Sequence, residues 1–374
     1  MPFSELIGQD RALGALRSAL ARGALHHAYL FGGPEGVGKR TAARLLAQAL
    51  NCAHTGGGRA PALRDAGGGR APAPRDDAAP VGVDPCGACV PCRKIARGIH
   101  PDVIELAEER VMAKAGRWEP KGGRAPSKDI VVDQVRDVVD HRLAMKRFEG
   151  RCRLVLVDPA DAMNVQAQNA LLKTLEEPPA DTVLVLVASS PDLLLPTLRS
   201  RCARMSFAPL ADDVVAGRLA AAGRSPEEIR LTVALAGGSL GRALELDAKA
   251  LALREEAVAA AAGLDADDAS TWIAFARDQG EDREAARETC ELLGVWLRDV
   301  LAFQAAGETV TLALGDLASL TRSAAEGLAP AETLRRIEYA GAAAAALRQN
   351  AAPALALERM LIGWFLHDDQ RDER

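Results

Sequence analysis

The chain has 374 residues, of which 48% are hydrophobic and only 3% aromatic. That length exceeds one ordinary core, so we expect two or three domains with cores of Leu, Val, Ile and Ala. The formal charge of -5 at pH 7 argues against a protein that coats nucleic acid non-specifically, because such proteins need a broad basic surface.

The N-terminal sequence, MPFSELIGQD, has no basic segment followed by an apolar one, and no apolar run in the chain is long enough to span a membrane. We therefore expect a cytoplasmic protein with no membrane partner. In a reducing compartment, the seven cysteines indicate metal ligands or free thiols rather than a disulfide framework.

Short apolar runs alternate with helical patterns over roughly the first half of the chain. Strands are predicted at Ala28–Phe31, Val103–Leu106, Leu154–Val157 and Val183–Val187, and helices are predicted to begin near Lys39, Ile130 and Met163. Strands that alternate with helices predict a parallel sheet covered on both faces, so the predicted fold class is α/β.

The strand pattern stops at Pro209, and Ala/Leu-rich segments with helical spacing follow it. These segments are Asp212–Ala222, Pro226–Ala236, Leu240–Val258, Glu284–Phe303 and Pro330–Leu347. We predict an α/β domain over 1–208, a small helical domain over 209–268 and a second all-helical domain over 269–374.

Two stretches, 53–85 and 108–128, have the composition of insertions. The sequence GGGRAPA occurs at Gly56–Ala62 and Gly67–Ala73, and GGRAP recurs at Gly122–Pro126. Gly, Pro, Arg and Ala without apolar periodicity cannot offset the entropy of ordering, so both stretches are predicted to be mobile surface loops. A weak nucleic-acid contact through their arginines is the functional alternative.

A phosphate-binding loop is predicted at Gly33–Arg40, GPEGVGKR, between a predicted strand and a predicted helix. Its glycines (Gly33, Gly36 and Gly38) let backbone N–H groups surround phosphates, and Lys39 can reach the terminal phosphates. A Gly-rich turn of no functional relevance is the alternative interpretation.

Two groups needed for hydrolysis are missing from this loop and its partner strand. Arg40 stands where the pattern G-x-x-x-x-G-K-[ST] requires a magnesium-ligating hydroxyl, and Thr41 is turned about 100° away by one helical step. The strand Leu154–Val157 ends in Asp158, which could assist a magnesium ion, but Pro159 stands where a glutamate would orient water. We therefore predict a degenerate site. Its candidate nucleotide-binding residues are Gly33, Gly36, Gly38, Lys39, Thr41 and Asp158.

A zinc site is predicted at four cysteines in a module over 52–92. Cys86, Cys89 and Cys92 give two consecutive C-x2-C steps, and Cys52 ends the helix expected after the phosphate loop. Four thiolates suit tetrahedral zinc and leave no open position, so the role of this metal is structural. Buried or free thiols are the alternative, and His100 is a possible substitute ligand whose default interpretation is structural.

Four segments resemble the bacterial clamp-loader AAA+ family. They are NALLKTLEEPP at Asn169–Pro179, HAYLF at His27–Phe31, SRC at Ser200–Cys202, and NAAPALALERML at Asn350–Leu361, which is similar to the closing helix of the family's collar domain. By its own pattern, 169–177 is an amphipathic helix stopped by two prolines, with Leu171, Leu172 and Leu175 turned inward.

The resemblance implies a P-loop NTPase-like parallel sheet domain with a small helical lid, followed by an all-α collar that holds five subunits in a ring. It implies gamma/tau and delta subunits of DNA polymerase III as partners in that hetero-pentameric ring. It also implies the sliding clamp and primed DNA as partners, with DNA contacted through the assembled complex during ATP-dependent clamp loading.

The triplet Ser200–Cys202 matches the family motif whose arginine enters a neighbour's ATP site, so the resemblance assigns Arg201 as an arginine finger acting in trans. Such a finger contributes about 10³–10⁵ in rate. Gly238–Arg242 resembles the second sensor motif, and Ser189 and Ser190 stand where a first sensor would be, with no role assigned to them.

The lost groups at Arg40 and Pro159 imply a stator subunit of DNA-directed DNA polymerase III with no autonomous catalysis, in which ATP or ADP in its own site is doubtful. Two alternatives stay open. One is an active ATPase motor subunit of the same loader, and the other is a zinc-containing DNA-binding protein on an AAA+ scaffold.

Overall fold

The computed structural model describes residues 3, 6–55, 63–64, 83–246, 248–349 and 351–366. The chain divides into two compact units. The first comprises 1–214 with 239–241, and the second comprises 215–238 with 242–374. The repeats at Gly56–Ala62 and Gly67–Ala73 lie outside the described residues.

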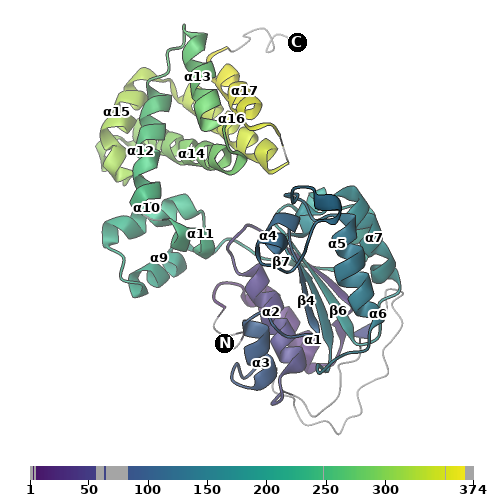
Figure 1. Ribbon diagram of the computed structural model, residues 1–374. Coiled ribbons are helices and arrows are strands. Elements are labelled where there is room, and N and C mark those ends of the chain that lie inside the picture. The colour runs from purple at the N-terminus through teal and green to yellow at the C-terminus, as the bar shows by residue number, and fades with distance from the viewer. Residues whose placement is uncertain are drawn as a thin grey trace, which may run out of the picture. The chain divides into compact units, whose positions relative to one another are not determined.

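A parallel sheet of five strands forms the first unit in the described part of the chain (Figure 1). Its spatial order is β4 (Val103–Leu106), β5 (Arg153–Val157), β6 (Thr182–Ala188), β2 (Ala28–Gly32) and β7 (Ala203–Ser206). Every neighbouring pair runs parallel. The four strands expected from the sequence are confirmed, whereas the edge strand β7 was not predicted. A separate parallel pair joins β1 (Leu25–His26) to β3 (Leu63–Arg64).

Helices cover both faces of this sheet. One face carries α1 (Asp10–Ala21), α2 (Lys39–Asn51) and α3 (Val90–Ala96) (Figure 1). The other carries α4 (Glu109–Lys114), α5 (Val132–Gln134), a π-helical segment Val135–Asp140, α6 (His141–Ala144), α7 (Val165–Glu176) and α8 (Pro196–Arg199). Successive strand residues point to opposite faces, so Tyr29 packs into the core beneath α2 and Leu30 into the core beneath α7.

The carboxyl ends of the strands meet at one edge of this sheet. The phosphate loop follows β2, Asp158 follows β5, and Ser189 follows β6, which lies between these two strands. Ligands of open α/β sheets bind at the carboxyl ends of the strands, so the predicted nucleotide residues converge at the position expected for a site.

The rest of the described chain is helical. Its elements are α9 (Asp212–Ala221), α10 (Pro226–Ala236), α11 (Leu240–Glu245), α12 (Ala248–Ala262), α13 (Ala269–Gln279), α14 (Arg283–Ala306), α15 (Ala318–Gly327), α16 (Pro330–Arg348) and α17 (Pro353–Phe365). The largest buried side chains of its core are Trp296 and Trp364. The segment Leu240–Val258, expected to have helical spacing, contains α11, which ends at Glu245, and the first part of α12, which begins at Ala248.

Local sequence accounts for several of these helix starts. Ser225 caps α10 by accepting from the Glu228 N–H, while Glu228 bonds back to the Ser225 N–H and Pro226 takes the first helical position. Asp282 likewise caps the long helix α14. The predicted α/β class with a helical C-terminal region is confirmed. The finer division of the helical region into a lid (209–268) and a collar (269–374) stays a prediction.

The second predicted insertion, 108–128, surrounds a buried carboxylate. Glu109 is fully buried, and it accepts hydrogen bonds from both terminal guanidinium nitrogens of Arg124, from the Ser127 N–H and from the Trp118 indole N–H. These contacts give the stretch an ordered centre that its composition did not predict. Within the described residues, no helix is both long enough and apolar enough to cross a membrane.

Candidate nucleotide and metal sites

The phosphate loop is held tightly against its surroundings. A Cβ on Gly33 would lie 2.1 Å from the backbone oxygen of Phe207, and the φ of Gly33 is +147°, so only glycine fits this position. Gly38, with φ +99°, directly precedes the first residue of α2. The N–H of Gly241 donates to the Gly36 carbonyl at 3.0 Å. The loop therefore has the left-handed turns that a phosphate cradle requires.

Lys39 begins α2 and is almost completely buried. Its ammonium donates to the carbonyl oxygens of Gly33 and Pro34 and lies 3.5 Å from the Ser189 hydroxyl. Burial lowers the pKa of Lys39, against the attraction of nearby carboxylates of which Glu35 is the strongest. The structure thus places this lysine at the loop, as the sequence predicted.

Arg40 occupies the position of the missing hydroxyl and pairs with two carboxylates. Its guanidinium lies 3.0 Å from Glu105 Oε2 and 3.5 Å from Asp158 Oδ2. Glu105, only 4% exposed, also accepts from Arg44 Nε and Nη2, both at 2.9 Å. Burial raises the pKa of Asp158, while Arg40 and Lys39 oppose that shift. An arginine–carboxylate cluster therefore lies beside the loop.

Arg201 lies after α8 with its side chain one-third exposed. One terminal nitrogen donates to the Thr197 carbonyl at 2.8 Å, and the other lies 2.7 Å from Glu176 Oε1, at the end of α7. Its guanidinium is thus anchored at both terminal nitrogens while part of the side chain faces solvent.

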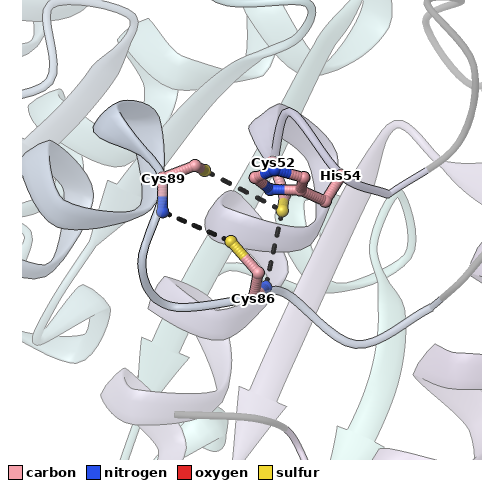
Figure 2. A group of neighbouring side chains, drawn as sticks. All are labelled: Cys52, His54, Cys86 and Cys89. Carbon is pink, nitrogen blue, oxygen red and sulfur yellow. Dashed lines mark hydrogen bonds between the residues drawn. The ribbon is translucent and has the colours of Figure 1, made fainter.

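A cluster of thiols and an imidazole lies where α2 ends (Figure 2). One donor atom from each of Cys52, His54, Cys86 and Cys89 lies within 4.8 Å of the others. The Cys89 and Cys52 sulfurs are 3.9 Å apart. Sulfur and imidazole donors in a group of this size suit tetrahedral zinc, so the side chains fit the metal that the sequence predicted.

Backbone N–H groups stabilise the thiolates of this cluster. The Cys89 N–H lies 3.3 Å from the Cys86 sulfur, and the Cys86 N–H lies 3.4 Å from the Cys52 sulfur. The Cys89 N–H is the largest cause that lowers the pKa of Cys86 to about 5. Because thiolates rather than thiols bind metals, these donors favour the metal-binding form.

His54 was missed from sequence, although it stands only two residues after Cys52. Cys92 was predicted as the fourth ligand, and it is fully buried at the start of α3, with a pKa raised by burial and by its contact with Cys89. His100 lies elsewhere, buried beside Asp102 and 3.7 Å from Glu149, so it does not join the cluster. The group of donor atoms within 4.8 Å of one another contains His54 and not Cys92, which contacts Cys89, so Cys92 as the fourth ligand stays a prediction.

A family model and several bacterial proteins match this chain. A family model described as DNA polymerase III, delta subunit, matches residues 8–63 and 76–211, which is just over half of the chain. The chain belongs to this family. The resemblance to bacterial clamp-loader subunits is thereby confirmed.

Two bacterial DNA polymerase III subunits show how far the similarity extends. DNA polymerase III subunit delta' of Pseudomonas aeruginosa is 39% identical over 51% of this chain and 46% of its own length. DNA polymerase III subunit tau of Salmonella typhimurium is 32% identical over 75% of this chain and 39% of its own length. The chain therefore spans less than half the length of these relatives.

A solved DNA polymerase III gamma subunit-related protein from Thermotoga maritima aligns with 94% of this chain and 98% of its own, at 15% identity. Its TM-score is 0.33, which is too low to support a conclusion about this chain.

The residues at the positions of the family's sensor motifs form ion pairs and hydrogen bonds within the chain. Arg242 forms an ion pair with Glu291 on α14. The Ser189 and Ser190 N–H groups both donate to Asp161 Oδ2, at 2.9 and 2.7 Å. The resemblance of Gly238–Arg242 to a sensor motif therefore stays a prediction, and no role is assigned to Ser189 or Ser190. Thr41 is half-buried one residue beyond Arg40.

Sequence reasoning missed Glu105, although one signal for it was present. A glutamate within the apolar run VIEL is unusual, because a buried carboxylate needs cationic partners. Arg40 and Arg44, one helical turn apart on α2, supply these partners.

Proposed function

We propose that this chain is a delta-prime-type subunit of the DNA polymerase III clamp loader, a stator that does not hydrolyse ATP itself. The observation that carries this proposal is the guanidinium of Arg40 at the magnesium-ligand position, paired with Asp158. Hydrolysis by a phosphate-loop protein needs a hydroxyl and an acid on magnesium, and a residue that orients the attacking water. Here the hydroxyl is replaced, the acid is paired, and Pro159 has no group to orient water.

The chemical contribution of the subunit is then made in trans by Arg201. Anchoring by the Thr197 carbonyl and Glu176 limits the rotation of a long side chain, while its partial exposure leaves N–H groups for a neighbour's phosphate. An arginine positioned in this way neutralises charge that develops on a transferring phosphoryl group.

The zinc is structural in this proposal. Cys52, Cys86 and Cys89, with His54 or Cys92, would hold it and so join the end of α2 to the start of α3. A closed set of four N and S donors leaves no position for substrate, so the metal contributes folding free energy and no chemistry.

The partners follow from the family. We propose a hetero-pentameric ring with gamma/tau and delta subunits, held by the helical domain over 269–374. The ring would open the sliding clamp and place it on primed DNA. The chain's net charge of -5 favours DNA contact through the assembled ring over binding by the chain alone.

The finger is tested in a loader reconstituted with Arg201→Ala. We expect single-turnover hydrolysis at the neighbouring site to fall about 10³-fold while ring assembly is unchanged, since an arginine finger contributes at least that much. The matched control is Arg199→Ala, because Arg199 lies two residues away and pairs with Asp192. A loader that contains this control variant should hydrolyse ATP normally. Normal clamp loading with Arg201→Ala would refute the assignment.

A second candidate is a motor subunit. The tau relative matches 75% of this chain, against 51% for the delta' relative. The motor proposal requires ATP turnover by the purified chain and its loss in Lys39→Ala.

A further inference from the structure

The side chains around Asp158 do not fit a magnesium ion. Magnesium needs near-octahedral oxygen ligands at about 2.0–2.1 Å, and phosphate-loop proteins supply a hydroxyl and an acid for it. In this chain the hydroxyl is absent, and the acid already lies 3.5 Å from the Arg40 guanidinium. A divalent cation placed on Asp158 would be repelled by a fixed positive charge a few ångströms away.

The position of Arg40 is held by more than one contact. Its second terminal nitrogen lies 3.0 Å from Glu105 Oε2. Arg44 binds both oxygens of the same carboxylate, which fixes the Glu105 side chain in a fork geometry. Arg117 donates to the Glu105 carbonyl oxygen at 3.0 Å. The cluster therefore holds a cation at this edge of the sheet without any metal.

We propose that Arg40 replaces magnesium in this phosphate loop, so that the loop binds the phosphates of ATP or ADP without a divalent cation. An arginine has five N–H donors, and Arg40 directs one terminal nitrogen at Glu105 and the other at Asp158, which leaves the Nε–H and a second N–H on each terminal nitrogen. Its side chain is 46% exposed, so a ligand can approach it from solvent. Lys39 and the backbone N–H groups of the loop supply the other contacts.

This inference rests on the proposed loss of hydrolysis chemistry, and it concerns binding alone. Its test is isothermal titration of the full-length chain with ATP and with ADP, in magnesium and in the chelator EDTA. For each nucleotide, we expect the dissociation constant in magnesium and the dissociation constant in EDTA to agree within about threefold. That difference is smaller than a tenfold change, which corresponds to about 1.4 kcal/mol of binding free energy. Manganese titrated into the nucleotide complex should give the electron paramagnetic resonance signal of metal bound only to nucleotide.

Variants identify the residue responsible. Arg40→Thr restores the hydroxyl, and should make ATP binding at least about tenfold tighter in magnesium than in EDTA. Arg11→Thr is the matched control, because it removes an exposed arginine of α1 outside the cluster, and it should leave binding indifferent to magnesium. Lys39→Ala should abolish binding in both buffers.

Two results would overturn the inference. One is an unmodified chain that binds ATP at least tenfold more tightly in magnesium than in EDTA, and the other is a chain that binds neither nucleotide in either buffer. Magnesium-dependent binding without hydrolysis would overturn this inference alone, whereas ATP turnover by the chain would overturn the proposed function as well.

Discussion

Buried carboxylates in the first unit each have several donors, and Asp102 is the clearest case. It is 3% exposed at the start of β4 and accepts from the N–H groups of Phe148, Glu149 and Gly150 at 2.6–2.9 Å. Burial alone would raise the pKa of Asp102, but these donors outweigh it and lower the pKa below its usual value. The ionised side chain therefore organises the turn before β5.

This contact makes stability depend on pH. The pKa of Asp102 is lower in the folded state than in the unfolded state. The contribution of Asp102 to the free energy of unfolding is therefore fully present above the unfolded-state pKa of about 3.9, and it is lost as pH falls through the folded-state pKa. Asp102→Asn should lower the free energy of unfolding by about 1–3 kcal/mol at pH 7, the cost of weakening charge-assisted hydrogen bonds.

Urea unfolding at pH 7 and at pH 3 measures this difference. The gap between Asp102→Asn and the unmodified chain should shrink at pH 3, and Glu119→Gln, at an exposed carboxylate, should show little change at either pH. A gap of the same size at both pH values would contradict the role of the ionised form.

Unlike Asp102, Glu176 contributes little to stability. Its side chain is half-exposed, so its ion pair with Arg201 contributes only about 0–1 kcal/mol. A glutamate at the end of a helix is unfavourable toward the helix dipole, and the arginine compensates for it. We infer that Glu176 positions Arg201.

In a reconstituted loader, Glu176→Gln should lower kcat for ATP by about tenfold with KM little changed, since misplacement of a reacting group costs rate. Glu176→Asp should restore part of the loss, and Glu177→Gln, at the exposed neighbour, should be silent. If Arg201→Ala slows turnover and Glu176→Gln does not, the positioning role is wrong and the finger stands.

Among the elements, buried strands were the easiest to predict. β5 and β6 are buried along their whole length, so they read as continuous apolar runs. The edge strand β7, ARMS, alternates half-buried and exposed side chains over only four residues. So short a polar alternation gives no signal that can be distinguished from a loop, which is why β7 was missed.

The proposed zinc module has a ligand set that the cysteine spacing alone could not decide. The C-x2-C steps predicted Cys86, Cys89 and Cys92, but the fold also places the His54 imidazole within 4.8 Å of three thiols. That proximity depends on how the chain turns after α2, and no local pattern encodes it.

Zinc analysis of two variants separates the candidates. The purified chain should hold one zinc ion. If Cys92 is the fourth ligand, Cys92→Ser should lose zinc to a chelator at least about tenfold faster than the unmodified chain, whereas His54→Ala should retain its zinc. The reverse result would assign His54. Absence of zinc from freshly purified protein would contradict a structural site at this cluster.

At the scale of the whole molecule, the sequence predicted the parallel sheet, the helical C-terminal region and the convergence of Lys39, Arg40 and Asp158. It did not predict that Arg40 forms an ion pair with Glu105. Glu105 is distant in sequence, and only strand register places β4 beside β5 and so brings its carboxylate within 3.0 Å of Arg40. Long-range pairs of this kind follow from topology rather than from local composition.

The central proposal for this protein is that its nucleotide site does not hydrolyse ATP. The direct measurement is steady-state phosphate release by the purified chain with magnesium and ATP, in parallel with Lys39→Ala. We predict that both release phosphate at the same background rate. Turnover above background that disappears in Lys39→Ala would contradict the claim, because it would require an active metal and water at Asp158.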